Sequence, residues 1–159
     1  MTSTIITRKA ATGDLPALHQ FQQGIVAAER PFDMTLCAGA IQYYDLERLL
    51  SDTNVELVIA EFAGEPVGCG FARIDFAKPY VKHRKQAYLG LMYVEPRLRG
   101  QGVNRQVIRH LQCWCRSKGV RELRLDVYAG NAAAIKAYEK VGFAGHLLEM
   151  RVELSAETD

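Results

Sequence analysis

The sequence contains no apolar run long enough to cross a bilayer, which argues against a membrane-spanning protein. Its first residues also lack the basic start and the long apolar stretch of a secretory signal peptide. It shows no low-complexity stretch, no internal repeat and no linker-like segment. We therefore expect a cytoplasmic protein with no membrane partner, in which residues 1–159 form a single domain.

A strong charge of one sign is absent as well. The formal net charge is +2 at pH 7, so small an excess that charge alone predicts no nucleic-acid partner. Hydrophobic residues make up 48% and charged residues 24% of the chain, which is normal for a soluble globular protein and argues against overall disorder.

Cysteine is scarce and is not arranged for metal binding. Cys113 and Cys115 resemble half of a metal site, but no second cysteine or histidine pair stands at zinc-finger spacing. Both also fall in a helical pattern, where residues two apart point in different directions. We expect these two cysteines, together with Cys37 and Cys69, to be free thiols, and we expect no metal site.

Short elements alternate in type along the chain. Hydrophobic patterns predict strands at 5–8, 55–62, 67–74, 87–94, 123–128 and 143–154, and helices at 15–28, 41–50, 103–118 and 134–141. The run at 87–94 is almost wholly apolar, as in a central strand buried on both faces. A hairpin in the first half and a strand-helix-strand unit in the second predict a mixed sheet.

A glycine-containing turn, residues 97–102, joins the predicted central strand to a helix. The first N–H groups of a helix lack intrahelical partners, and the helix dipole places partial positive charge there. Gly100 and Gly102 let the backbone turn sharply and let a ligand approach closely, and Arg97 and Arg99 add positive charge. A diphosphate fits such a cradle, although an ordinary strand-to-helix turn explains the glycines equally well.

Two other phosphate motifs fit this turn less well. A P-loop would need a Gly-Lys-Ser/Thr ending, which is missing. A dinucleotide fingerprint would place its third glycine at Arg105.

A second segment of interest covers residues 131–143. Asn131 follows a predicted strand and can cap the next helix, in which Ala134 and Tyr138 lie one turn apart on one face. On pattern alone, a capped amphipathic helix with a core tyrosine explains this segment.

The two segments together resemble one family. Arg97-x-x-Gly100-x-Gly102 resembles the Arg/Gln-x-x-Gly-x-Gly/Ala signature of the GNAT superfamily of acyl-CoA N-acyltransferases. Residues 131–143, with Asn131, Ala134, Tyr138, Gly142 and Phe143 in place, resemble that family's second cofactor motif. The motifs occur in the family's order and at its usual separation, and the resemblance covers residues 55–154.

The resemblance implies a fold, a cofactor and its site. The fold class is α/β (α+β), with a mixed, mostly antiparallel central sheet of six to seven strands flanked by helices. The cofactor is acetyl-CoA, whose pantetheine would lie where the strands at 87–94 and 123–128 splay apart. The residues implied to bind it are Met92, Tyr93, Val94, Arg99, Gly100, Gln101, Gly102, Val103, Asn104, Asn131, Ala134 and Tyr138. The family usually has a small residue where Asn104 stands.

Acetyl transfer to an amine needs a neutral amine, a stabilised oxyanion and a protonated leaving thiolate. Tyr138 resembles the family's tyrosine at the cofactor sulfur and is the expected general acid. A backbone N–H near Met92 or Val94 could stabilise the oxyanion, and the sequence leaves both open.

The base is less clear, because the strand carboxylate of many relatives is missing at Gly90 and Leu91. We rank Glu29 first, since residues 29–33 fall where the family's variable substrate loop should be. Asp75, Asp126, His83 and a water chain are the alternatives.

The predicted function is transfer of an acetyl group from acetyl-CoA to a primary amine of a small molecule or peptide, by direct attack in a ternary complex. The alternative is a non-catalytic acyl-CoA-binding module, which the missing carboxylate favours and Tyr138 opposes. Glu29, Asp33 and Asp45 could attract a cationic amine. The basic loop at 78–85 is either solvated or faces an anion, such as the cofactor's 3′-phosphate or an acidic acceptor. Dimers are common in the family, so a homodimer is a further expectation.

Overall fold

The computed structural model describes residues 4–157, which divide into two compact units at Tyr128. The first unit contains the sheet and three of the four α-helices, and the second contains α4 (Ala132–Lys140). No helix in the described part of the chain is long and apolar enough to span a bilayer.

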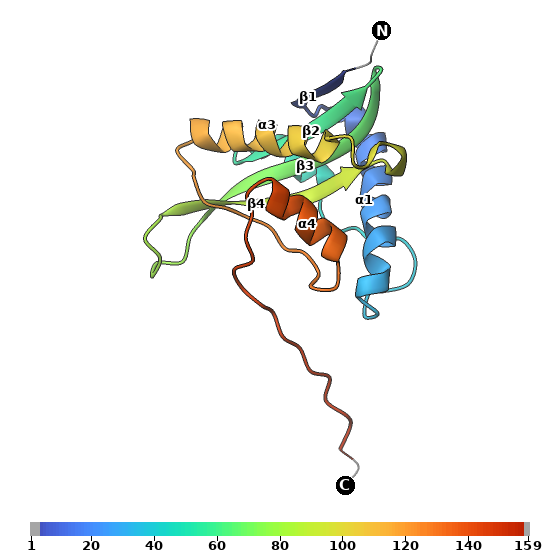
Figure 1. The fold of residues 1–159 in the computed structure, drawn as a ribbon, viewed down its shortest axis with the longest axis vertical. Helices are drawn as coiled ribbons and strands as arrows, with labels where there is room; N and C mark the ends of the chain where they lie inside the picture. Colours follow the sequence, from blue (N-terminus) through green and yellow to red (C-terminus); the bar gives the residue numbers. More distant parts are fainter. Residues whose placement is uncertain (1–3, 158–159) are drawn as a thin grey trace. The chain divides into compact units, whose positions relative to one another are not determined.

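The sheet of the first unit has five strands in the order of the sequence (Figure 1). These are β1 (Ile5–Lys9), β2 (Val55–Phe62), β3 (Glu65–Phe76), β4 (Lys85–Val94) and β5 (Leu123–Arg124). Neighbours from β1 to β4 are antiparallel, and β5 runs parallel to β4. The mixed sheet is confirmed, but the expected six to seven strands are not: five are present among residues 4–157.

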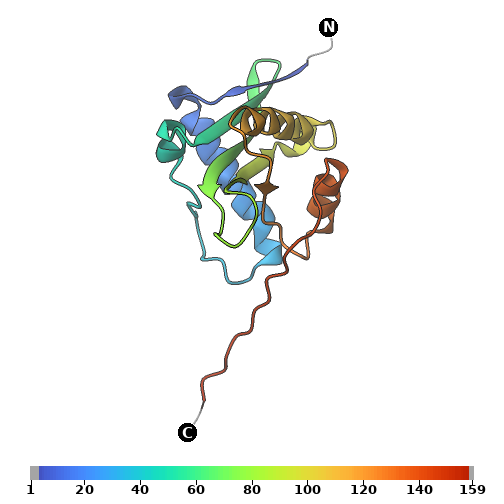
Figure 2. The same ribbon diagram turned by 90° about the vertical axis from the view of Figure 1, so that its left-hand side faces the viewer.

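Helices cover both faces of this sheet (Figures 1 and 2). On one face, α1 (Leu15–Glu29) and α2 (Leu46–Ser51) enclose a core that contains Phe21, Leu57 and Phe71. On the other face, α3 (Val103–Ser117) packs against β2 and β3. Its buried residues recur at helical spacing, namely Val103, Val107, Ile108, Leu111 and Cys115.

The predicted helix at 41–50 is wrong over its first half, because α2 begins only at Leu46. Two glutamines of α1 hold the preceding residues as a loop. The Gln23 amide donates to the Ile41 carbonyl at 2.7 Å, and the Tyr44 N–H donates to the buried Gln22 side chain at 2.9 Å. These bonds satisfy backbone groups that a longer helix would otherwise use.

Two predicted strands are also wrong in whole or part. The strand expected at 123–128 shrinks to Leu123–Arg124, and residues 143–154 form no strand. A strand forms where a neighbouring strand pairs with it, and β5 pairs with β4 only at Leu123 and Arg124.

A β-bulge interrupts β4 near its middle. Cys69 of β3 faces Tyr93 and Phe71 faces Gly90, so Gly70 alone opposes both Leu91 and Met92. Leu91 has φ 54°, a left-handed conformation that costs a side-chain-bearing residue roughly 1–3 kcal/mol. The Cys69 thiol donates to the Leu91 carbonyl at 3.1 Å and helps to hold this shape.

In the second unit, α4 has both ends capped. The Asn131 side chain accepts from the Ala134 N–H at 3.1 Å, as the sequence predicted. Gly142, at φ 101°, ends the helix, where the N–H groups of residues 141–143 bond the last carbonyls.

Candidate active site

The opening beside β4 is the first component of the candidate site. β4 and β5 pair only at Ala87↔Leu123 and Tyr88↔Arg124, so beyond Tyr88 that edge of β4 has no strand partner among residues 4–157. β4 continues to Val94, six residues beyond its last pair with β5. A free strand edge of this kind can hydrogen-bond an extended ligand through main-chain groups.

The glycine turn is the second component. Gly100 and Gly102 have φ 75° and 87°, so their left-handed conformation explains why glycine stands at both positions. Gly102 is the N-cap of α3 and has no side chain to bond the first amides of that helix. Val103 is buried, and its side chain meets Gly68 of β3, which fixes the helix start on the sheet.

Arg99 is held beside the last residues of β4. Its Nε donates to the Val94 carbonyl at 3.1 Å, and its guanidinium lies 5.9 Å from the centre of the Tyr93 ring. Arg97 instead pairs with Glu65 at 3.6 Å, and the Gln101 side chain bonds the Arg97 carbonyl at 3.0 Å. The uncapped amides and Arg99 thus form a cradle that suits a diphosphate.

The side chains of Met92 and Tyr93 are used for packing on opposite faces. A Cβ on Gly70 would lie 2.5 Å from the Met92 sulfur, and a Cβ on Gly24 would lie 2.5 Å from the Tyr93 ring. Tyr93 also stacks on Phe21, with ring centres 5.1 Å apart. The main-chain groups of Met92 and Tyr93 are therefore the ones left for a ligand in the opening.

The structure explains the missing carboxylate at Gly90. A Cβ there would lie 2.6 Å from Phe71 Cζ and 2.8 Å from the Tyr44 hydroxyl. Tyr44 and Phe71 meet edge to face, with ring centres 4.9 Å apart. The Tyr44 hydroxyl, which the sequence analysis did not single out, occupies the space that a side chain at Gly90 would need.

Glu29 is half-buried at the end of α1 and accepts a hydrogen bond from the Tyr43 hydroxyl at 2.8 Å. Burial raises the pKa of this carboxyl above its ordinary value, and the nearby negative charge of Asp33 raises it further. The bond from Tyr43 acts in the opposite direction. A carboxylate with a raised pKa is a better proton acceptor than an exposed one.

Further tyrosines bind carboxylates nearby. The Tyr128 hydroxyl donates to Asp33 at 2.9 Å, and its ring stacks on Phe32 with centres 6.3 Å apart. Tyr88 donates to Asp126 at 3.3 Å and shares a hydrogen bond with Tyr44. Sequence reasoning did not single out these tyrosines.

The other candidate bases have structural partners. Asp75 forms an ion pair with Arg73 at 3.0 Å, and the His83 ring bonds Gln86 at 2.9 Å. Asp45, a candidate for attracting the amine, instead caps α2 by accepting from the Arg48 N–H at 3.0 Å.

The basic loop at 78–85 precedes β4, whereas the glycine turn follows it. β4 has ten residues, which corresponds to about 30 Å of extended chain. At this distance the loop does not reach a cofactor phosphate held at the turn. His83, Arg84, Lys85 and Arg121 line a hollow of about 680 Å³ at this end of the strand.

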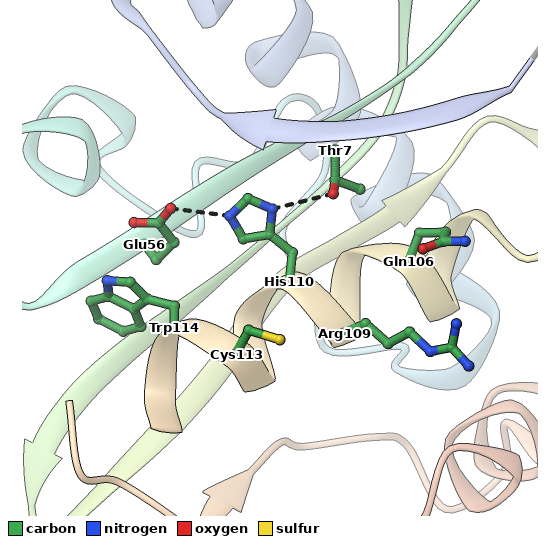
Figure 3. Close-up of a pocket in the computed structure, with 7 residues that line it drawn as sticks. All are labelled: Thr7, Glu56, Gln106, Arg109, His110, Cys113 and Trp114. Carbon is green, nitrogen blue, oxygen red and sulfur yellow. Dashed lines mark hydrogen bonds and ion pairs between the residues drawn. The ribbon is translucent and has the colours of Figure 1, made fainter. Parts of the chain in front are cut away.

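A separate polar array lies under α3 (Figure 3). The two ring nitrogens of His110 bond Thr7 of β1 and Glu56 of β2, each at 3.2 Å, beside a hollow of about 430 Å³. β1 and β2 form the sheet edge opposite the β4–β5 opening. We interpret the array as a structural link between α3 and the sheet.

In the second unit, the residues of the second motif share one side of α4. Asn131, Ala134 and Tyr138 are half-buried, while Ala133, Lys136 and Ala137 are exposed. The Tyr138 ring packs edge to face on Phe143, with centres 5.9 Å apart. Within residues 4–157 no group of three His, Cys, Asp or Glu side chains could hold a metal ion.

Known proteins resemble this chain in both sequence and fold. The aminoglycoside N(6′)-acetyltransferase type 1 of Stenotrophomonas maltophilia is 32% identical over 103 residues, which cover 62% of this chain and 66% of that protein. The match thus spans just under two thirds of that relative's length. The BH1408 protein of Bacillus halodurans, solved in mutant form, superposes with TM-score 0.85 at 16% identity, over 94% of this chain and 99% of its own. A protein of Clostridium acetobutylicum described as a predicted acetyltransferase, solved with acetyl-CoA, gives TM-score 0.67 at 18% identity over 93% of this chain and 96% of its own.

A family model provides the broadest match. The model of the acetyltransferase (GNAT) family matches residues 24–143, which include both cofactor motifs and Glu29. GNAT acetyltransferases use acetyl-CoA as their acyl donor, which agrees with the cradle at the glycine turn. Because the match covers well over half of the sequence, the chain belongs to the acetyltransferase (GNAT) family.

Proposed function

We propose that this protein is an N-acetyltransferase that transfers the acetyl group of acetyl-CoA to a primary amine by direct attack in a ternary complex. One observation carries the proposal: the unpaired edge of β4 leads directly into an uncapped helix start at Gly102. The edge suits pantetheine and the helix start suits a diphosphate, so one continuous surface matches both parts of coenzyme A.

In this proposal the first unit holds most of the cofactor. Main-chain groups of Met92, Tyr93 and Val94 bond the pantetheine, and the amides from Arg99 to Asn104 bond the diphosphate. Asn131, Ala134 and Tyr138 of the second motif serve the same cofactor, so that residues 1–159 act as a single catalytic domain. When bound, acetyl-CoA would supply the acetyl thioester that the amine attacks.

Two side chains move protons. Glu29 takes a proton from the attacking amine, which its raised pKa and its position beside the 30–45 loop favour. Tyr138 donates its phenolic proton to the departing thiolate as the new C–N bond replaces the C–S bond. An N–H of the bulged strand, at Met92 or Val94, stabilises the carbonyl oxygen.

The binding-module alternative loses its main support. The sequence argument for it was the missing carboxylate at Gly90, and Tyr44 fills that space for steric reasons. Thiol release from acetyl-CoA, measured with a panel of primary amines, distinguishes the two functions. Cofactor binding with no amine-dependent release would favour the module.

A matched pair of glycine variants tests the cofactor site. Gly102 and Gly119 both have positive φ, 87° and 74°, and a Cβ on either would meet open space. Gly102→Ala and Gly119→Ala should therefore lose similar stability, about 1 kcal/mol each. Only Gly102→Ala should raise the KM for acetyl-CoA, by about tenfold. Equal KM values in the two variants would contradict the assignment of the turn.

A further inference from the structure

The loop before α2 is fixed to α1 on both sides of Tyr43. The Gln23 amide nitrogen donates to the Ile41 carbonyl at 2.7 Å, and its amide oxygen accepts from the Ile41 N–H at 3.2 Å. Gln22, whose side chain is buried, accepts from the Tyr44 N–H at 2.9 Å. Tyr43 lies between these two anchored residues, so its main chain is held against α1.

The same helix ends at Glu29, and the Tyr43 side chain reaches its carboxylate. The Tyr43 hydroxyl donates to Glu29 Oε2 at 2.8 Å, and both residues are half-buried. Within residues 4–157, the other carboxylate oxygen, Oε1, has no hydrogen-bond or ion-pair partner. One oxygen of Glu29 is thus fixed by the phenol, while the other is left to accept a proton.

The phenol and the carboxylate also affect each other's titration. Burial raises the pKa of Tyr43, and the hydrogen bond to Glu29 raises it further, so the phenol stays protonated wherever carboxyl groups titrate. In return, the bond from Tyr43 lowers the pKa of Glu29, which burial raises. A hydrogen bond to an ionised oxygen is stronger than one between neutral groups. Tyr43 therefore stabilises the charged form of Glu29.

Few other groups act on Glu29 from the elements around it. Asp33 is the charged side chain that raises its pKa further. The Arg30 guanidinium instead donates to two main-chain carbonyls of the loop. Tyr128 donates to Asp33 and acts on Tyr43. The remaining titratable groups of this region act on Tyr44, and these are Arg73 of β3, Tyr88 of β4 and Asp126.

We propose that Tyr43 is a positioning residue for acetyl transfer, which holds one oxygen of Glu29 so that the other can accept the proton of the attacking amine. The inference rests on the proposed function, in which Glu29 is the base. One proton passes from the amine nitrogen to Glu29 Oε1 as the nitrogen attacks the thioester carbon. The Tyr43 proton stays on the phenol oxygen throughout this step.

The titration of Glu29 tests the pairing without any turnover. In NMR spectra of the side-chain carboxyl carbons, the Glu29 signal is identified by its loss in Glu29→Gln. Tyr43→Phe should move the midpoint of this signal to higher pH, because the variant lacks the bond that favours the charged form.

Tyr128→Phe is the matched control for this titration. It also removes a bond from a tyrosine to a carboxylate, at 2.9 Å, but the carboxylate is that of Asp33. It should leave the midpoint of Glu29 unchanged, and near-UV circular dichroism confirms that both variants are folded. An unchanged midpoint in Tyr43→Phe, or an equal change in the two variants, overturns the inference.

The pH dependence of turnover tests the role of Tyr43 in the reaction. Relative to the wild type, Tyr43→Phe should lose about threefold more kcat/KM at low pH than at high pH, because less of its Glu29 is ionised there. A purely structural role would lower kcat/KM by the same factor at every pH. In the Glu29→Gln background, Tyr43→Phe should cause no further pH-dependent loss.

The two measurements separate failure of the inference from failure of the proposed function. If the Glu29 midpoint does not move in Tyr43→Phe, although Glu29→Gln abolishes the fall in kcat/KM at low pH, only the role of Tyr43 is overturned. If the midpoint moves while the pH dependence of kcat/KM does not, Glu29 is not the base, and the role of Tyr43 is overturned together with that step of the proposed function.

Discussion

The tight packing around Gly90 leads to a quantitative prediction. In Gly90→Ala the new Cβ would lie 2.6 Å from Phe71 Cζ and 2.8 Å from the Tyr44 hydroxyl, so both rings must shift. Phe71 is fully buried and the two rings pack edge to face, which leaves little room for either to move. Overpacking of this kind costs about 2 kcal/mol. For a chain of this length, the loss corresponds to a fall in Tm of roughly 4–8 °C.

The measurement is a thermal melt with two comparisons. Gly13→Ala is the control, because a Cβ on Gly13 would have no neighbour within 4 Å and should change stability by less than about 0.5 kcal/mol. Tyr44→Phe removes one of the two contacts, so Gly90→Ala should cost less by about 0.5–1 kcal/mol in that background. If Gly90→Ala has the same Tm as the Gly13→Ala control, the steric explanation of the missing carboxylate is refuted.

Three further predictions concern ionisable groups. Tyr138→Phe should lower kcat at least tenfold in steady-state kinetics and leave acetyl-CoA affinity nearly unchanged; an unaltered kcat would remove its role as general acid. Because burial raises the pKa of Glu29, kcat/KM of the wild-type protein should fall as the pH drops through that raised pKa. Glu29→Gln should lower kcat/KM and abolish this fall at low pH. An unchanged pH profile in the variant would exclude Glu29 as the base. The Arg8 guanidinium, 2.8 Å from Asp14, lowers the pKa of that carboxyl, so the stability from this pair is present above about pH 4 and is lost as the pH falls through the folded-state pKa. Asp14→Asn should therefore cost about 1–2 kcal/mol at pH 7 and much less once the pH is below the folded-state pKa, in melts at several pH values; a pH-independent loss would contradict this.

The parts of the fold that the sequence predicted are those with a local physical cause. Gly100 and Gly102 needed positive φ, and Asn131 needed only the adjacent helix start to cap. The apolar run of β4 predicted a buried strand without any knowledge of which strands pair with it.

What the sequence could not predict depended on distant partners. The loop at 41–45 is set by Gln22 and Gln23, some 20 residues earlier in the chain. The Tyr44 hydroxyl occupies the space beside Gly90, and no local sequence pattern connects these two residues. Residues 143–154 have the alternation of a strand but form none, because a strand depends on a neighbouring strand that local pattern does not reveal.

The bulge at Leu91 also changes which β4 side chains face the acceptor side of the sheet. Before the bulge, Tyr88 and Gly90 face the core under α1, with Gly90 against Phe71. After it, Leu91 and Tyr93 face the same core, so the inward-facing positions change from even to odd numbers at the bulge. Met92 points to the α3 face, against Val107. If Glu29 takes the proton from the amine, as proposed, a carboxylate introduced at position 92 would lie on the opposite face of the sheet. Under the proposed function, designs that alter proton transfer should therefore use the tyrosine and carboxylate side chains of the 29–44 segment.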